Sequence, residues 1–177
     1  DSLKQVARSS GEDEIILTTR LGQAIRFKEK ALRDMGRQAA GIRGIRLKKG
    51  DEIVGMDVRQ QKEKPTVDNG KKKDQKEDKQ YLLILTEKGY GKRTLVDDYR
   101  LQGRGGSGIK AGKITSKTGE IIATRVLTVE EDLIVISQKG QVIRTPIDSI
   151  PKLSRATQGV RIMRLDEGDR VASATCI

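Results

Sequence analysis

The residues best suited to chemistry form a glycine-rich stretch, Gln102-Gly103-Arg104-Gly105-Gly106-Ser107-Gly108. Glycines let the backbone approach a phosphate closely and offer N–H groups to it, and an arginine adds a charged fork. The same composition is typical of a tight loop between strands, so both interpretations stay open. The stretch also contains the GxGxxG pattern of dinucleotide-binding folds. Those folds need a helix after the glycines, whereas residues 109–115 alternate like a strand, so we exclude them.

Catalytic and metal-binding chemistry finds little support elsewhere. The chain has no His and one Cys, Cys176, which excludes Ser-His-Asp and Cys-His catalysis and most zinc sites. Asp97 and Asp98 are adjacent, so their carboxylates point apart, and no third ligand is near in sequence. Tyr99 has no base beside it, and Lys113 is followed by Ile114 where a P-loop needs Ser or Thr. We therefore expect no catalytic residue, no metal site and no cofactor in this chain.

The charge balance indicates a polyanionic partner. Lys and Arg number 36 against 25 Asp and Glu, a formal charge of +11. Nucleic acid is the most common such partner, and membrane surfaces and acidic proteins also qualify. Four aromatic residues in all are too few for base stacking, which leaves contact with a duplex backbone. With no apolar run of 18 residues and no signal-peptide pattern, we expect a soluble cytoplasmic protein without a membrane partner.

Short apolar stretches predict an all-β fold. Residues 15–18, 82–86, 121–124 and 133–136 are of strand length, rich in branched aliphatic side chains, and end near a Gly or a charged turn. The one helix candidate, residues 28–35, is brief and ends at a glycine, so we expect a loop or a single turn there.

Internal repeats indicate the architecture. The turn glycines of three hairpin-like segments are followed 19 residues later by a second glycine and then by a third with an acid beside it: Gly22, Gly41 and Gly50; Gly89, Gly108 and Gly119; Gly140, Gly159 and Gly168. Each second glycine opens an alternating basic segment, expected as a strand, at residues 42–47, 109–114 and 160–165. A period of about 50 residues with several strands per unit predicts a propeller-like array of small sheets.

We divide the chain accordingly into unit 1 (residues 1–59), a charged insertion (60–80), unit 2 (81–128) and unit 3 (129–177). The insertion has seven basic and five acidic residues and one Val as its only aliphatic residue, so it cannot supply a core strand. We favour a solvated, mobile insertion, and an arm that touches DNA is the alternative.

Three stretches carry a resemblance to a known family. They are residues 90–94 with 99–110, residues 41–47 with 50–56, and residues 157–165. The chain resembles the C-terminal DNA-wrapping domain of the DNA gyrase A subunit over nearly its whole length outside the insertion. The resemblance implies a β-pinwheel, here about three blades of four-stranded antiparallel sheet from the later half of a ring of about six, with duplex DNA bent around a basic rim.

The family's seven-residue box, Gln-Arg-Arg-Gly-Gly-Lys-Gly, is matched in part by residues 102–108. Gly103 and Ser107 stand where the box has basic residues, so we expect a box-like loop of a later blade, with residues 35–41 and 153–159 as more degraded copies. The expected DNA contacts come from this loop and from the repeated basic segments: Gln102, Arg104, Gly105, Gly106, Gly108, Lys110, Lys113, Lys92, Arg93, Arg26, Arg37, Arg43, Arg46, Arg144, Arg155, Arg161 and Arg164.

The resemblance further implies that the cleavage tyrosine lies in another domain of the gyrase A subunit and that the gyrase B subunit hydrolyses ATP with magnesium. This chain would then be a non-catalytic duplex-binding module of a bacterial type IIA topoisomerase that supports negative supercoiling, near the nucleoid. Two alternatives remain: the C-terminal domain of the equivalent topoisomerase IV subunit, and a propeller-like scaffold for protein interaction.

Overall fold

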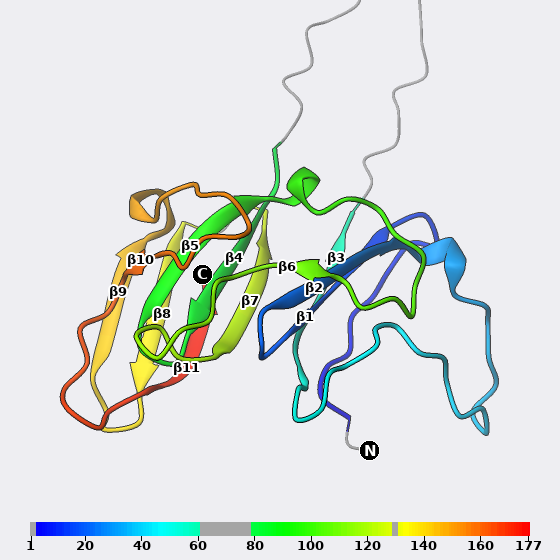
Figure 1. The fold of residues 1–177 in the computed structure, drawn as a ribbon. Helices are drawn as coiled ribbons and strands as arrows, with labels where there is room; N and C mark the ends of the chain where they lie inside the picture. Colours follow the sequence, from blue (N-terminus) through cyan, green and yellow to red (C-terminus); the bar gives the residue numbers. More distant parts are fainter. Residues whose placement is uncertain (1–2, 61–78, 129–130) are drawn as a thin grey trace, which may run out of the picture.

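The computed structural model describes residues 3–60, 79–128 and 131–177, so the expected insertion lies almost wholly outside the described residues. Three antiparallel sheets and three short 3-10 turns make up the regular structure of the described part (Figure 1). The all-β class is confirmed. No helix within these ranges is long and apolar enough to cross a membrane.

Each sheet is built around a hairpin of two long strands. The first sheet has the order β3 (Ile53–Arg59), β1 (Glu14–Thr19), β2 (Gln23–Lys28), β6 (Ile109–Lys110). The second has the order β7 (Ile121–Leu127), β4 (Tyr81–Thr86), β5 (Tyr90–Leu95), β10 (Val160–Arg161). The third has the order β11 (Val171–Cys176), β8 (Asp132–Ser137), β9 (Val142–Pro146). The 3-10 turns η1 (Glu29–Ala31), η2 (Val96–Asp98) and η3 (Ile147–Ser149) follow β2, β5 and β9.

The fourth strand of a sheet comes from the next unit along the chain. Strand β6 of unit 2 completes the sheet of unit 1, and β10 of unit 3 completes the sheet of unit 2. The expectation of four strands per blade therefore holds for two sheets, and the third has three among the described residues. The expected strands at 109–114 and 160–165 shrink to two residues each. Residues 42–47 form a loop and belong to none of the strands of the described part.

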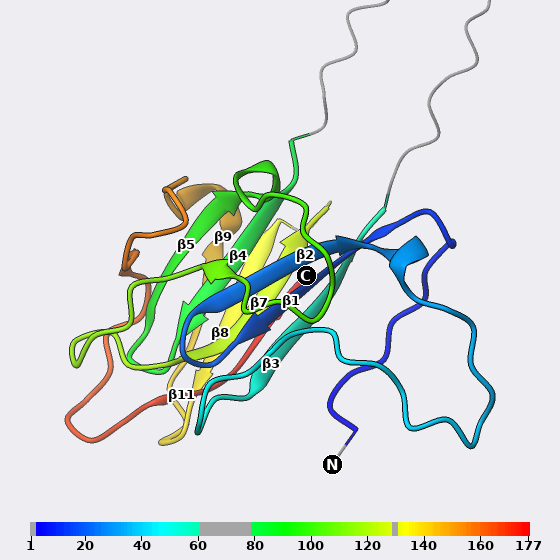
Figure 2. The same ribbon diagram turned by 45° about the vertical axis from the view of Figure 1, so that its right-hand side comes forward.

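The order of the sheets explains why some strands are apolar throughout. In β4, Leu82 and Ile84 pack against residues of the first sheet, whereas Leu83 and Leu85 pack against β8 and β11 of the third. Because both faces of this strand are covered, it reads as a continuous apolar run without alternation. In Figure 2 the first sheet comes forward and the other two lie behind it.

One edge of every sheet lies inside the array and the other outside. Strands β3 and β11 both contact β7, so these three strands form the inner side of the array. Strands β6 and β10 stand at the opposite ends of their sheets and form the outer side. All nine glycines of the repeat have positive φ, which only glycine adopts readily. This backbone conformation explains why glycine recurs at these positions.

Candidate nucleic-acid interface

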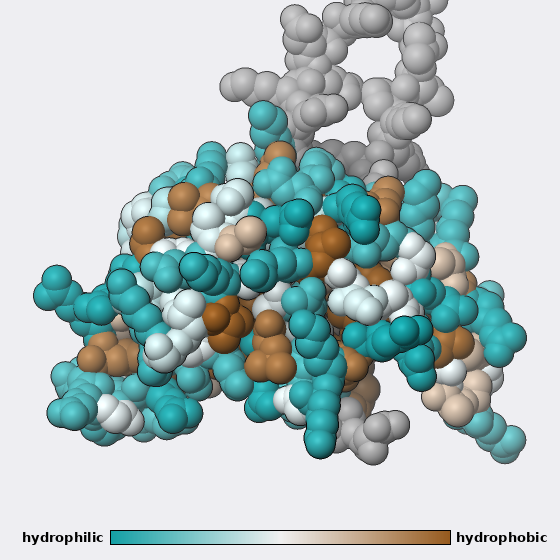
Figure 3. Space-filling model, in the orientation of Figure 1, coloured by the Kyte–Doolittle hydropathy of each residue, from teal (hydrophilic) through white to brown (hydrophobic). Residues whose placement is uncertain are grey.

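The three longest stretches of the chain without Asp or Glu are residues 35–50, 99–119 and 149–165, and all three are basic. Each segment begins at the end of a 3-10 turn or shortly after it, and then crosses the outer side. Figure 1 shows the second and third of these segments passing in front of the sheets, and Figure 3 shows that this face is mostly hydrophilic, with hydrophobic residues in small separate groups. Each unit thus contributes one of these three long segments to the outer side.

The first two segments are joined by backbone hydrogen bonds. The N–H of Arg46 donates to the carbonyl of Gly106 at 2.8 Å, and the N–H of Gly105 donates to the carbonyl of Gly44 at 2.6 Å. Arg104 donates through Nε to the carbonyl of Ala31 at 3.0 Å. The box-like loop of unit 2 therefore lies directly on the basic loop of unit 1.

The second and third segments meet in a similar way. The N–H of Lys113 donates to the carbonyl of Thr157 at 3.1 Å, and the Arg155 guanidinium donates to the carbonyl of Lys110 at 3.1 Å. The three segments consequently form one continuous surface. We call nine of its cations the basic outer surface: Arg43, Arg46, Arg104, Lys110, Lys113, Lys117, Arg155, Arg161 and Arg164.

A groove of about 540 Å³ lies where units 2 and 3 meet on this surface, and its lining includes Tyr90, Lys117, Arg161 and Arg164 but no acidic residue. Arg161 donates to the Tyr90 hydroxyl at 3.0 Å. The Arg161 guanidinium and the Lys117 ammonium also lie 5.5 and 5.6 Å from the centre of the Tyr90 ring. The hydrogen bond from Arg161, together with both nearby positive charges, lowers the pKa of the Tyr90 phenol. The groove therefore favours an anion.

The structure exposes most of the expected DNA-contacting cations. Those with exposed side chains are Arg37, Arg43, Arg46, Arg104, Lys110, Lys113, Arg144, Arg161 and Arg164, and Arg155 is half-buried. Gln102, Gly105, Gly106 and Gly108 lie half-buried in the loop that carries Arg104. Gly108 packs so closely that a Cβ would lie 2.6 Å from the Ala24 carbonyl oxygen, which supports the structural interpretation of this glycine.

Lys92 differs from the expectation because it is buried, with 1% of its surface exposed. Its ammonium donates to the carbonyls of Ser154 at 2.8 Å and Arg155 at 2.6 Å. Burial, reinforced by the Arg155 charge, lowers the pKa of Lys92 to about 8. Lys92 thus holds the loop that presents Arg155 and does not itself face a partner.

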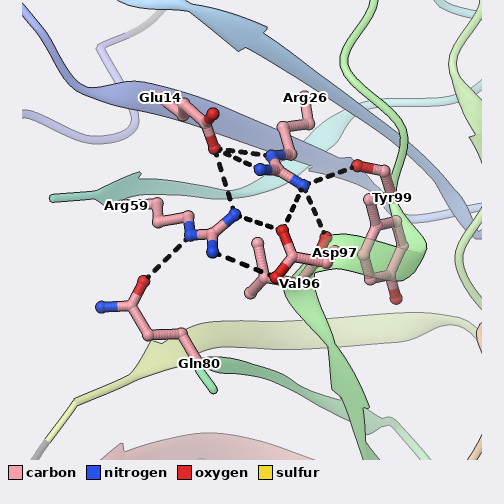
Figure 4. A network of polar contacts seen from close by, with 7 residues as sticks. All are labelled: Glu14, Arg26, Arg59, Gln80, Val96, Asp97 and Tyr99. Atoms are coloured by element: carbon pink, nitrogen blue, oxygen red, sulfur yellow. Dashed lines mark hydrogen bonds and ion pairs between the residues drawn. The ribbon is translucent and has the colours of Figure 1, made fainter. Parts of the chain in front are cut away.

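Arg26 and Arg93 are also buried, each with 6% exposed. Figure 4 shows the Arg26 guanidinium between Glu14 of its own sheet, at 2.6 Å, and Asp97 of unit 2, at 3.1 Å. Arg59 binds the same two carboxylates, and its hydrogen bonds are the main cause that lowers the pKa of Asp97. The guanidinium groups of Arg26 and Arg93 donate to carboxylates and carbonyls of the protein itself. We therefore leave these two arginines, and the buried Lys92, out of the basic outer surface.

Two members of the groove, Lys117 and Tyr90, were missed by the sequence reasoning. Tyr90 lies on β5. Lys117 had a usable signal, since it belongs to one of the three segments without acids. The hydroxyl of Tyr90 had none, because its neighbour Arg161 comes from another unit. No cluster of three His, Cys, Asp or Glu side chains that could hold a metal occurs in the described ranges.

Comparison with known proteins gives a family match. The model of the family described as DNA gyrase C-terminal domain, beta-propeller, matches residues 13–59, 80–128 and 131–177. The DNA gyrase A subunit of Staphylococcus epidermidis is 40% identical over 173 residues, which cover 98% of this chain and 18% of that protein. The Staphylococcus aureus protein of the same name has the same identity and coverage. The chain therefore spans less than a fifth of the length of these relatives.

Solved structures show the same fold at lower identity. A DNA gyrase A C-terminal domain superposes with a TM-score of 0.76 at 22% identity, covering 94% of this chain and 51% of that one. The C-terminal domain of a DNA topoisomerase IV gives a TM-score of 0.79 at 20% identity, covering 94% of this chain and 47% of that one.

Proposed function

Because the chain belongs to the family of DNA gyrase C-terminal domains, we propose that it binds duplex DNA through the basic outer surface and bends the duplex around it. The observation that carries the proposal is the continuity of the surface: three segments without acids, one from each unit, held side by side by hydrogen bonds. Cations in a row neutralise successive phosphates and release counterions.

Bending supplies a reason for so many cations. Bending 20–30 base pairs costs on the order of 1–6 kcal/mol, which several phosphate contacts offset. Exposed Lys and Arg contact phosphates without reading bases, so sequence preference is expected to be slight. The box-like loop has lost two of the family's basic residues, at Gly103 and Ser107, so its share of the binding rests on Arg104 and on the cations of the neighbouring segments.

The proposal extends to the protein from which the module comes. The gyrase relatives share 40% identity, whereas the topoisomerase IV domain shares the fold, so a role in gyrase is favoured. Strand cleavage then belongs to the remaining part of the gyrase A subunit, and ATP hydrolysis with magnesium to the gyrase B subunit. The module needs no cofactor, supports negative supercoiling, and works in the bacterial cytoplasm on nucleoid DNA.

A salt series on a short duplex tests the binding. With five or more phosphate contacts, the logarithm of the association constant should fall with the logarithm of salt concentration with a slope of about −4 or steeper. Lys110 and Lys113 have exposed ammonium groups without a partner among the described residues. Replacing both with Ala should lower the slope by about 1.8.

Lys139→Ala is the control, because Lys139 is an exposed cation at the tip of the β8–β9 hairpin and belongs to none of the three segments. An affinity that stays flat across the salt series would favour the protein-scaffold alternative. Ligation of a nicked plasmid with the protein bound separates wrapping from plain binding, since only wrapping traps a linking-number change of one sign. A result without such a change would favour a topoisomerase IV type of domain.

A further inference from the structure

A cavity of about 300 Å³ lies between the second and third sheets. Strands β4 and β7 line it on one side, and β8 and β11 line it on the other. Because β7 and β11 belong to the inner side of the array, the cavity lies on that side too. None of its residues belongs to the three basic segments, so the proposed contact with DNA does not involve it.

Two alanines at this junction leave the space open. The strand pairings place Ala123 where the first sheet has Gly55, and Ala174 where the second sheet has Thr124. At the junction of the first and second sheets, Thr124 packs so closely on Gly55 that a Cβ on the glycine would collide with the threonine hydroxyl. Ala174 lacks the hydroxyl and methyl groups of a threonine, so the corresponding contact is not closed between the second and third sheets.

The cavity has an apolar floor and a positively charged mouth. Leu83, Leu85 and Leu133 form the floor, with 3%, 1% and 1% of their surfaces exposed. Arg125 is exposed and Cys176 is half-buried, so these two residues stand at the mouth. No Asp or Glu lines the cavity in the described part of the chain. The floor therefore favours a hydrocarbon group, and the mouth favours an anionic one.

The volume limits what can occupy the cavity. Pockets for small molecules measure about 300–1,000 Å³ and are mostly apolar, with a few polar groups that orient the ligand. A cavity at the lower end of this range has room for one small molecule. It excludes a helix of a protein partner, whose diameter with side chains is about 10–12 Å.

We propose that this cavity binds a small apolar carboxylate, with its hydrocarbon body between the two sheets and its carboxylate beside Arg125. The body fills space that protein atoms fill at the first junction, so it leaves water and gains contacts with the three leucines. A ligand bound there contacts units 2 and 3 together and stabilises the folded chain against unfolding.

Alkylation of Cys176 by iodoacetamide tests the proposal without DNA. Cys176 is the only cysteine of the chain, so the reaction reports on the mouth of this cavity. Octanoate is the probe. At about ten times its dissociation constant it should slow the reaction about tenfold, because only the unoccupied protein reacts. Acetate, which lacks the hydrocarbon body, and octylamine, which carries the opposite charge, should have little effect at the same concentration. The urea-unfolded chain controls for any direct effect on the reagent.

Two variants separate the contributions of charge and space. Arg125→Met keeps an apolar side chain without the charge and should weaken octanoate binding about two- to fivefold, as for an exposed ion pair. Arg164→Met is the matched control, because Arg164 is an exposed arginine outside the cavity, and it should leave octanoate binding unchanged. Ala123→Gly combined with Ala174→Thr recreates the first junction and should abolish the protection by octanoate. Urea denaturation checks that this double variant is folded.

The midpoint of urea unfolding gives a second reading, since a ligand of the folded state raises it. An alkylation rate and a midpoint that octanoate leaves unchanged would overturn the proposal. Equal protection by octanoate and octylamine would do the same, as would full protection by octanoate in the folded double variant.

Discussion

Two sets of cations in this protein have the same charge and lie in similar stretches of sequence, but one set is buried and the other is exposed. Arg26, Lys92 and Arg93 lie on long strands and are enclosed by carbonyls and carboxylates, many from the next unit. Lys110 and Arg161 are exposed and lie on the short strands β6 and β10, which pair with β2 and β5. The difference teaches that cations enclosed by protein oxygens hold the units together, whereas exposed cations keep their charge at the surface.

Arg26→Ala should give the largest effect and would sharpen the comparison. It leaves Glu14, whose side chain is 4% exposed, with Arg59 as its remaining cation at 3.4 Å. A buried pair broken on one side costs about 3–5 kcal/mol, which urea denaturation would measure. Arg26→Lys keeps the charge without the planar fork and should cost less. DNA affinity of the folded fraction should stay unchanged, and a specific loss of affinity would contradict the assignment of Arg26 to the interior.

We predict that the buried Lys92 makes the free energy of unfolding depend on pH, with a smaller effect than that of Arg26→Ala. Its pKa of about 8 in the folded chain lies below the ordinary value of 10.5, so the unfolded chain binds more protons between these values. Stability should therefore rise with pH through this window, by up to about 3 kcal/mol from this group. Lys92→Met removes that contribution. Urea denaturation of both proteins from about pH 7.5 to about pH 10.5 should give diverging curves, and parallel curves would show that burial does not depress the pKa.

Arg161→Ala examines the exposed set. Losing one phosphate contact should weaken duplex binding by about five- to tenfold and lower the salt slope by about 0.9, as fluorescence anisotropy would show. The free energy of unfolding should change by less than about 0.5 kcal/mol, as is usual for a surface site. A large loss of stability with an unchanged salt slope would move Arg161 into the structural set and break the comparison.

Tyr90→Phe should give the smallest effect. The change keeps the ring between Lys117 and Arg161 but removes the hydroxyl that accepts from Arg161. Affinity should fall by about two- to threefold, and the salt slope should stay the same, because no charge is lost. A changed slope would mean that Tyr90 orders more than one cation.

The sequence was sufficient for the class and the long strands, because turn glycines and β-rich stretches are local signals. It did not reveal the exchange of β6 and β10 between units, since two-residue strands carry no pattern and their partners are distant in the chain. For the same reason the sequence could not show that Arg93 is buried whereas Arg161 is exposed. Residues 91–94 are all buried, so no alternation marks which side chains face outward.

The exchanged strands also bear on the order in which the protein can fold during synthesis. A nascent chain that has emerged as far as Arg59 has three strands of the first sheet, and the fourth, β6, ends at Lys110. The Asp97 carboxylate that Arg26 needs arrives with the same stretch. Until then the first hairpin has an open edge, and Arg26 has Glu14 but not Asp97 as an ion-pair partner. The N-terminal sheet therefore cannot be finished before much of its neighbour has been translated, and its exposure to wrong pairing in that interval depends on the rate of translation.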